Sequence, residues 1–289
     1  MDNKIIDSTL LRKLDRLKLN TNLLLNQGYN GGRKSNGKGS SIEFSDYKEY
    51  VLGDDFRKID WNAYGRFQKL YVKLFEEERQ ASVNIFLDTS LSMDFGNPKK
   101  SLIAKKIASA LSYISLSNLD AVNIYSNGEN ELKETGYFNG KNTFQGLLKN
   151  MEKASFFSKN DLFQFIKKKN YKKGITMILS DLYSDYVEES IKYLSYKNQR
   201  IIVLHVLSKE ELAPDLKGDL RFIDSETEEE KDVSVTNPVL KAYEKTLKNF
   251  IREHKEICRK YGCKYILVSN EISIEEILFD QLVKHGILR

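Results

Sequence analysis

Two aspartates follow apolar stretches of the sequence, and two serines follow the first aspartate at a fixed spacing. The first group is Asp88, Ser90 and Ser92, in an Asp-x-Ser-x-Ser pattern, and the second aspartate is Asp181. Carboxylate and hydroxyl oxygens are hard ligands of the kind that Mg²⁺ prefers, and such an ion keeps several waters. The pattern therefore predicts a Mg²⁺ site, with Mn²⁺ as an alternative ion, that retains an open coordination position.

The elements that must position these residues are typical of an open α/β sheet. From residue 83 onward, apolar runs rich in β-branched residues alternate with helix-length amphipathic segments, as in a doubly wound, mostly parallel sheet covered by helices on both faces. Ligands of such sheets bind beyond the carboxyl ends of the strands, so both aspartates would face one crevice if their strands are neighbours. The predicted strands are 83–87, 121–125, 175–179, 201–206 and 265–268, with an antiparallel edge strand over 131–138 after a Ser-Asn-Gly turn.

The chain is predicted to fall into three regions. Residues 1–40 are expected to form an amphipathic helix over 5–25, where apolar positions recur every three to four residues, and then a basic, flexible, glycine-rich loop. Residues 41–80 are predicted to be an aromatic and charged, β-rich extension that packs on the sheet. Residues 81–289 then form the α/β domain, with an inserted hairpin near 219–235.

Composition narrows the function classes. The 289 residues include 30% charged and 40% hydrophobic side chains, which is ordinary for a soluble domain, and no apolar run is long enough to span a bilayer. Two cysteines and the absence of a leader-like start predict a reducing, cytoplasmic location. The formal net charge is +5, and residues 1–41 hold all of this excess, so any attraction to polyanions would be confined to one arm. We expect neither a membrane span nor nucleic-acid binding.

Other reactive side chains form weaker patterns. The three histidines lie outside the loops that carry the aspartates, and His205 is predicted to be a core residue of an apolar strand. His254, Cys258 and Cys263 would supply only three loosely spaced ligands, so buried thiols are favoured over a zinc site. A phosphatase of the haloacid-dehalogenase type needs an acid where this chain has Ser90. A Mg²⁺-dependent phosphatase or nuclease that uses the same acidic crevice stays as the alternative function.

The Asp-x-Ser-x-Ser pattern resembles the metal-ion-dependent adhesion site of von Willebrand factor type A domains. The residues that match the motifs of that family are Asp88, Ser90, Ser92, Thr143 and Asp181. The resemblance implies that the two serines and the threonine bind the metal, and that the aspartates act directly or through water. Thr143 precedes a helix predicted to begin at Phe144, so its alternative role is that of an ordinary helix N-cap.

The stretch over residues 32–78 resembles a second family, the bacterial domain of unknown function 58. The matching residues are Glu43-Phe44, Asp46-Tyr47, Tyr50, Gly53-Asp54-Asp55, Arg57 and Ile59-Asp60-Trp61. The resemblance extends over nearly the whole chain from about residue 30 and implies a type A-like domain with an adhesion-site metal. Longer members carry membrane segments upstream, so this chain is expected to be the short soluble form. Members are commonly encoded beside MoxR-type AAA+ ATPases, which implies an adaptor that hands client proteins to such a motor.

These resemblances and residue patterns lead to one functional expectation. We expect a non-enzymatic, Mg²⁺-dependent protein-interaction module, in which Ser90, Ser92 and Thr143 hold the ion. Asp88 and Asp181 would orient it. An acidic side chain of a protein partner would complete its coordination shell, with a MoxR-type AAA+ ATPase as the expected partner.

Overall fold

A computed structural model describes residues 5–20, 42–77, 80–128, 131–156, 160–224 and 227–289 of the chain. The chain divides into two compact units, one formed by residues 1–27 and 81–289 and the other by residues 28–80. The first region predicted from the sequence is therefore split, because its helix belongs to the larger unit. The predicted basic loop that ends at residue 40 lies outside the described residues.

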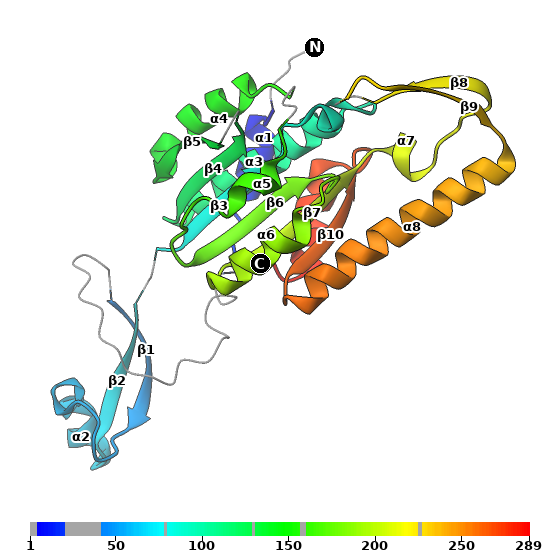
Figure 1. The fold of residues 1–289 in the computed structure, drawn as a ribbon. Coiled ribbons are helices and arrows are strands. Elements are labelled where there is room, and N and C mark those ends of the chain that lie inside the picture. The colour runs from blue at the N-terminus through cyan, green and yellow to red at the C-terminus, as the bar shows by residue number, and fades with distance from the viewer. Residues whose placement is uncertain (1–4, 21–41, 78–79, 129–130, 157–159, 225–226) are drawn as a thin grey trace. The chain divides into compact units, whose positions relative to one another are not determined.

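The larger unit is built on a sheet whose strands lie in the order β10-β7-β6-β3-β4-β5 (Figure 1). Neighbouring strands are parallel except β5, which runs antiparallel to β4 at the edge. The strands are β3 (Ser82–Leu87), β4 (Ala121–Asn127), β5 (Leu132–Asn139), β6 (Gly174–Ser180), β7 (Arg200–Leu207) and β10 (Lys264–Ser269). The predicted strands and the doubly wound, mostly parallel α/β fold are thus confirmed.

The sequence of each strand follows its place in the sheet. Every residue of the central strand β6 is buried, because helices cover both faces of the sheet at that position. In the edge strand β5 only Leu132 is buried, and the other residues are partly or fully exposed. A mostly apolar run therefore marks a central strand, whereas a mixed run marks the edge.

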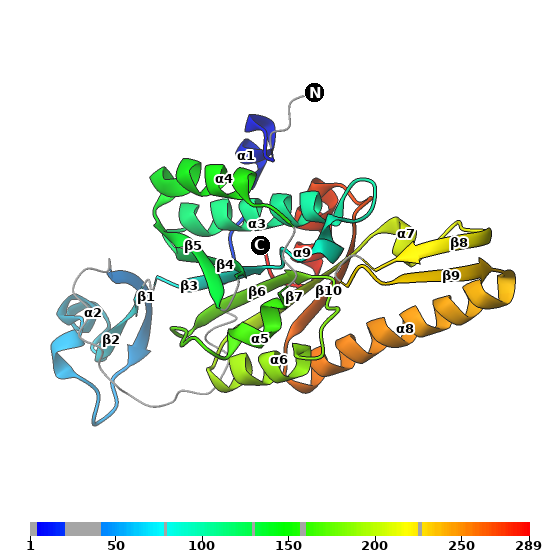
Figure 2. The same cartoon turned by 45° about the horizontal axis from the view of Figure 1, so that its top comes forward.

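Helices pack on both faces of the sheet (Figure 2). One apolar cluster joins α1, α3 and α4 to residues such as Ile85 on one side of β3. A second cluster joins α5, α6 and α8 to the opposite side, where Phe86 points. The helices are α1 (Ser8–Leu14), α3 (Lys100–Ser117), α4 (Phe144–Lys153), α5 (Leu162–Ile166), α6 (Val187–Tyr196), α7 (Lys209–Leu212), α8 (Asn237–Lys260) and α9 (Leu282–Lys284).

The hairpin predicted near 219–235 is present outside the main sheet. Its strands β8 (Gly218–Ile223) and β9 (Glu230–Val235) pair antiparallel with each other and form a separate two-stranded sheet. It leads directly into α8, a helix of 24 residues in which Leu247, His254 and Cys258 are the buried residues. In the described parts of the chain, no helix combines the length and the apolar character needed to cross a membrane.

The N-terminal helix is shorter than predicted. α1 ends at Leu14, whereas the apolar spacing predicted a helix over 5–25. The chain beyond α1 runs beside the C-terminus, where Leu19 forms an antiparallel bridge with Leu288. Pairing with a distant segment has therefore overridden the helical pattern after α1, and residues 21–25 lie outside the described residues.

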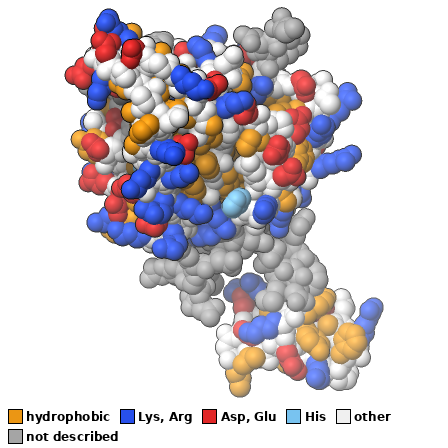
Figure 3. All heavy atoms as spheres, turned by 90° about the vertical axis from the view of Figure 1, so that its right-hand side faces the viewer, with side chains coloured by type: hydrophobic (Ala, Val, Ile, Leu, Met, Phe, Trp, Pro, Cys, Tyr) orange, Lys and Arg blue, Asp and Glu red, His pale blue; other side chains and the backbone are white. Residues whose placement is uncertain are grey.

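The smaller unit is a hairpin with short helices at one end. Its elements are β1 (Ile42–Glu49), a 3₁₀ helix (Phe56–Lys58), α2 (Trp61–Phe67) and β2 (Tyr71–Glu77), and β1 pairs antiparallel with β2. Asp60 caps α2, because its Oδ1 accepts hydrogen bonds from the backbone N–H groups of Asn62 and Ala63. Hydrophobic side chains are exposed on the surface of this unit (Figure 3). Its exposed large hydrophobic residues include Leu52 and Trp61.

The buried carboxyl group of Asp120 lies at the amino end of β4. Asp88 and Asp181 lie at the carboxyl ends of their strands, on the opposite side of the sheet's length. Asp120 Oδ1 accepts a hydrogen bond from the Ala81 backbone N–H at 2.9 Å, whereas its Oδ2 is buried and has no hydrogen-bond partner. Burial raises the pKa of Asp120 to about 6. The folded state therefore favours the protonated form of this side chain.

This raised pKa makes the stability of the protein depend on pH. Because the folded pKa lies above the unfolded one, the contribution of Asp120 is most favourable below the unfolded pKa and is lost as pH rises through about 6. The Asp120→Asn variant lacks this titration. We expect its free energy of unfolding, relative to the native chain, to increase by about 2 kcal/mol between pH 4.5 and 7.5. Urea unfolding at both pH values tests this, and a difference that does not change with pH would contradict it.

Candidate metal-binding site

Two neighbouring strands bring the predicted aspartates together. β3 pairs in parallel with β6, with Leu87 opposite Leu179, so both strands end at the same edge of the sheet. Asp88 follows β3 directly, and its backbone N–H donates to the Leu179 carbonyl at 3.0 Å. Asp181 follows the last residue of β6. The two strands are therefore neighbours, which is the condition under which both aspartates were expected to lie together.

Asp88 is buried and accepts hydrogen bonds at both carboxylate oxygens. The Ser180 hydroxyl donates to its Oδ2 at 2.6 Å. The Ser90 backbone N–H and the Asn127 side-chain amide donate to its Oδ1 at 3.0 and 3.1 Å. Burial, followed by the nearby charge of Asp181, raises the pKa of Asp88. The carboxylate is therefore fixed in position and would be stabilised by a positive charge placed beside it.

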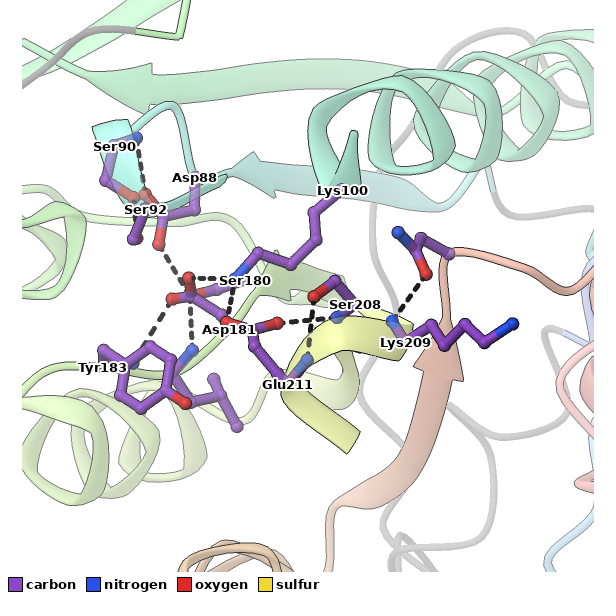
Figure 4. A network of polar contacts seen from close by, with 12 residues as sticks. Asp88, Ser90, Ser92, Lys100, Ser180, Asp181, Tyr183, Ser208, Lys209 and Glu211 are labelled. Carbon is purple, nitrogen blue, oxygen red and sulfur yellow. Dashed lines mark hydrogen bonds and ion pairs between the residues drawn. The ribbon is translucent and has the colours of Figure 1, made fainter. Parts of the chain in front are cut away.

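The two serines of the motif lie side by side (Figure 4). Ser90 is buried, Ser92 is partly buried within a 3₁₀ helix over Leu91–Asp94, and their hydroxyl oxygens are 2.9 Å apart. The hydrogen bond from the Ser90 N–H back to Asp88 forms an Asx turn, which directs the chain across the end of β3. Two neutral hydroxyl oxygens are thus presented next to the Asp88 carboxylate.

The turn after β6 holds Asp181 in a constrained backbone. Leu182 has a φ of 62°, a left-handed conformation that is uncommon for a residue other than glycine. The Ser180 hydroxyl accepts the Leu182 backbone N–H at 2.9 Å while it donates to Asp88, so one side chain links the two strand ends. A serine directly before the aspartate was the available signal in the sequence, and its linking role was not predicted.

A buried lysine contacts Asp181, and the sequence analysis did not identify it. Lys100 lies in the first turn of α3, and its fully buried Nζ is 2.9 Å from Asp181 Oδ2 and 2.7 Å from Glu211 Oε1. Glu211 belongs to a capping box with Ser208, whose backbone N–H donates to Glu211 Oε2 at 2.6 Å. Asp181 Oδ1 accepts a long hydrogen bond, 3.4 Å, from the Tyr183 backbone N–H. Figure 4 shows that Lys100 bridges the two carboxylates.

The structure does not bring Thr143 to this cluster. β5 runs antiparallel to β4, so that Asn139 pairs with Ala121, and Thr143 follows β5 beyond the amino end of β4. The length of β4, at about 3.3 Å per residue, separates that end of the sheet from Asp88 by roughly 20 Å. The Thr143 hydroxyl donates locally to the Gly140 carbonyl at 2.9 Å. This member of the predicted ligand set is therefore corrected.

The segment that does approach the cluster follows α4, whereas Thr143 precedes it. The Asn160 carbonyl accepts a hydrogen bond from the Asn127 side-chain amide at 2.6 Å, and the same amide donates to Asp88. Asn127 also accepts from the Thr89 backbone N–H at 2.7 Å through its Oδ1. Asn127 was part of the predicted Ser-Asn-Gly turn, so its place at the carboxyl end of β4 was available from the sequence.

None of the three histidines joins the cluster. His205 is buried in β7, where its Nδ1 lies 2.7 Å from the Tyr265 hydroxyl, and burial lowers its pKa to about 3. His254 is also buried, with its Nδ1 2.9 Å from the Phe250 carbonyl oxygen. Burial raises the pKa of Cys258 to about 12. These residues have the surroundings of core side chains, as the sequence predicted for His205.

The donor types in the cluster suit a hard divalent cation. Within the described ranges, no group of three or more His, Cys, Asp or Glu side chains is arranged to hold a metal, so a cation here would depend on the serine hydroxyls. Asp88 and Asp181 with Ser90 and Ser92 supply the mixed carboxylate and hydroxyl set that Mg²⁺ accepts while it retains water. Lys100 opposes the binding of a divalent cation at the cluster, because its ammonium group already neutralises part of the charge of Asp181.

Comparisons with other proteins place the chain among proteins of unknown function. A family model described as "Protein of unknown function DUF58" matches residues 46–254, and no curated protein matches the chain. The conserved hypothetical protein BatB from Bacteroides thetaiotaomicron aligns at 13% identity with a TM-score of 0.43, covering 71% of this chain and 98% of that one. An aerotolerance-related membrane protein from Bacteroides fragilis NCTC 9343 aligns at 14% identity with a TM-score of 0.43. This alignment covers 71% of this chain and 99% of that one.

Proposed function

We propose that this chain, which belongs to the DUF58 family of proteins of unknown function, is a Mg²⁺-dependent protein-interaction module. Ser90 and Ser92 would hold the ion through their hydroxyl oxygens. Asp88 and Asp181 would orient it from the ends of two neighbouring strands, directly or through water. Thr143 is left out of the proposed ligand set because it lies beyond the amino end of β4, whereas Asp88 and Asp181 lie at the carboxyl ends of their strands.

One observation supports this proposal above the others. The hydroxyl oxygens of Ser90 and Ser92 lie 2.9 Å apart beside a buried carboxylate whose pKa is raised. A carboxylate in such a place costs stability unless a cation compensates for it. The position beyond the carboxyl ends of parallel strands is also where ligands of open α/β sheets bind. When bound, Mg²⁺ would offer an open coordination position to an oxygen ligand from outside.

The same geometry favours binding over hydrolysis. General acid–base catalysis needs a group that can exchange a proton near the reacting atoms. Among the described residues, the further charged groups in contact with the cluster are Lys100 and Glu211, and these two are paired with each other. A phosphatase or nuclease that uses this crevice is therefore the less supported function.

The chemistry of the proposed site specifies the kind of partner. A hard cation with an open position favours an acidic side chain, so the partner would present an aspartate or glutamate on its surface. The resemblance of residues 32–78 to the DUF58 family suggests a MoxR-type AAA+ ATPase as this partner, and the chain would then act as its adaptor.

A binding measurement with purified proteins tests this function. The full chain would be immobilised and titrated with a purified MoxR-type ATPase, first in Mg²⁺ and then in EDTA. We expect binding in Mg²⁺, loss in EDTA, recovery when Mg²⁺ is restored, and no binding by the Ser92→Ala variant. Binding that persists in EDTA would contradict the metal dependence, and no binding in either buffer would contradict this choice of partner.

A further inference from the structure

A fully buried ammonium group lies between two carboxylates at the proposed site. Lys100 Nζ is 2.9 Å from Asp181 Oδ2 and 2.7 Å from Glu211 Oε1, and the lysine side chain is 0% exposed. Burial of a lysine is costly unless its charge is compensated, and here two carboxylates compensate for one ammonium. Lys100 is therefore a fixed positive charge within contact distance of a proposed cation ligand.

The charges of the cluster show what Lys100 changes. Asp88, Asp181 and Glu211, when ionised, carry three negative charges, and Lys100 reduces the net charge to two negative charges. A divalent cation would then make the site neutral. Without Lys100, the loaded site would keep one negative charge and would repel an incoming carboxylate. The lysine thus opposes the free cation but favours a negatively charged ligand on the loaded site.

We propose that Lys100 is a positioning residue that weakens the binding of the free divalent cation, so that the cation and an acidic partner side chain stabilise each other on the site. This inference rests on the proposed function and adds a mechanism by which metal binding and partner binding depend on each other. It assigns to the buried pair Lys100–Asp181 a role beyond the stability of the fold.

Glu211 allows the sign of this effect to be tested. Its carboxylate shares the Lys100 ammonium with Asp181, and its other oxygen is held by the Ser208 backbone N–H. A glutamine at this position keeps an acceptor for Lys100 but loses the negative charge. The positive charge of Lys100 would then act on Asp181 and on the cation with less compensation, so cation binding should weaken further.

The experiment titrates Mn²⁺ alone into the full-length protein and reads free Mn²⁺ by electron paramagnetic resonance. We expect Lys100→Met to bind Mn²⁺ at least about tenfold more tightly than the native chain, a change of about 1.4 kcal/mol, and Glu211→Gln to bind it more weakly. Lys99→Met is the matched control, because Lys99 is the preceding residue and its ion pair with Asp94 is exposed. Its affinity should stay within about twofold of the native value.

The outcomes separate this inference from the proposed function. If the native chain shows no saturable Mn²⁺ binding, the proposed function is contradicted. If the native chain binds Mn²⁺ and both Lys100→Met and Glu211→Gln weaken it, the ion pairs are merely structural and the inference is overturned. If neither variant changes the affinity, the inference is likewise overturned. Should Lys100→Met not fold, Lys100→Gln removes the same charge with a polar side chain: tighter Mn²⁺ binding by that variant supports the inference, and unchanged or weaker binding contradicts it.

Discussion

Replacement of both Ser90 and Ser92 by alanine is expected to weaken Mn²⁺ binding by at least about 100-fold. The loss of an outer-shell partner of a metal ligand typically costs 10- to 100-fold in affinity, so the loss of two proposed direct ligands should cost at least as much. Ser90 lies in the Asx turn after β3 and Ser92 lies in the 3₁₀ helix that follows. Removal of their hydroxyls leaves the hydrogen bonds of Asp88 to Ser180 and Asn127 in place. The fold should therefore be kept while cation binding is lost.

A threonine that the sequence assigns to the ligand set provides the control for this experiment. Thr143→Val removes a hydroxyl of similar chemistry, but the structure places that hydroxyl on the Gly140 carbonyl at the opposite edge of the sheet. Isothermal titration with Mn²⁺ should give the native affinity for Thr143→Val and little or no binding for the double serine variant. Equal losses in both variants would restore Thr143 as a ligand, and no loss in the double variant would remove the serines from the site.

The Gly174→Ala substitution is expected to lower the free energy of unfolding by about 3 kcal/mol. Gly174 begins β6 and lies opposite Ser82 of β3 in the parallel register. A Cβ atom at this position would lie 1.9 Å from the Ser82 carbonyl oxygen, a backbone atom that cannot move without separating the two strands. These are the strands that carry Asp88 and Asp181, so the variant should also weaken Mn²⁺ binding.

A second glycine supplies the matched control for stability. Gly146 lies within α4, and a Cβ built at this position meets no atom within 4 Å. Gly146→Ala should therefore stabilise the protein by about 0.5–1 kcal/mol, because alanine loses less backbone entropy in a helix. Urea unfolding of both variants tests the pair. A Gly174→Ala variant as stable as the native chain would mean that the close approach of β3 and β6 is not required by the fold.

The parts of the fold that were predicted correctly rest on burial that the sequence records directly. β6 is a mostly apolar run because both of its faces are covered, and similar runs, each with one or two polar residues, also mark β3 and β7. Asp88 and Asp181 were expected to lie together if their strands are neighbours, and β3 and β6 pair in parallel in the structure. These features do not depend on which distant side chains happen to meet.

Thr143 was assigned to the ligand set by its resemblance to a motif alone. The direction of the preceding strand, β5, places it away from the other ligands. The Ser-Asn-Gly turn predicted that the chain returns antiparallel along β4. The residues just after β5 therefore lie near the amino end of β4. The segment that comes back to the carboxyl edge is the one after α4, where Asn160 contacts Asn127. The signal was therefore present in the sequence, but it was not applied to the ligand set.

The buried lysine could not be predicted in the same way. Charged residues are rarely buried, and Lys100 follows the exposed Lys99 with nothing in the local pattern to distinguish them. Its partner Glu211 is 111 positions away in the sequence, and only the pairing of β6 with β7 brings α7 close to Asp181. Contacts of this kind depend on the tertiary structure and leave no periodic pattern.

The binding of a divalent cation beside Ser90 and Ser92 is tested most directly by locating the ion in the protein. Diffraction from crystals of the full chain soaked in Mn²⁺, collected at the manganese absorption edge, would locate the ion. We predict an anomalous peak within coordination distance of the Ser90 and Ser92 hydroxyls and next to the Asp181 carboxylate. A map with no peak there, and with the Lys100 ammonium in that position, would contradict the account.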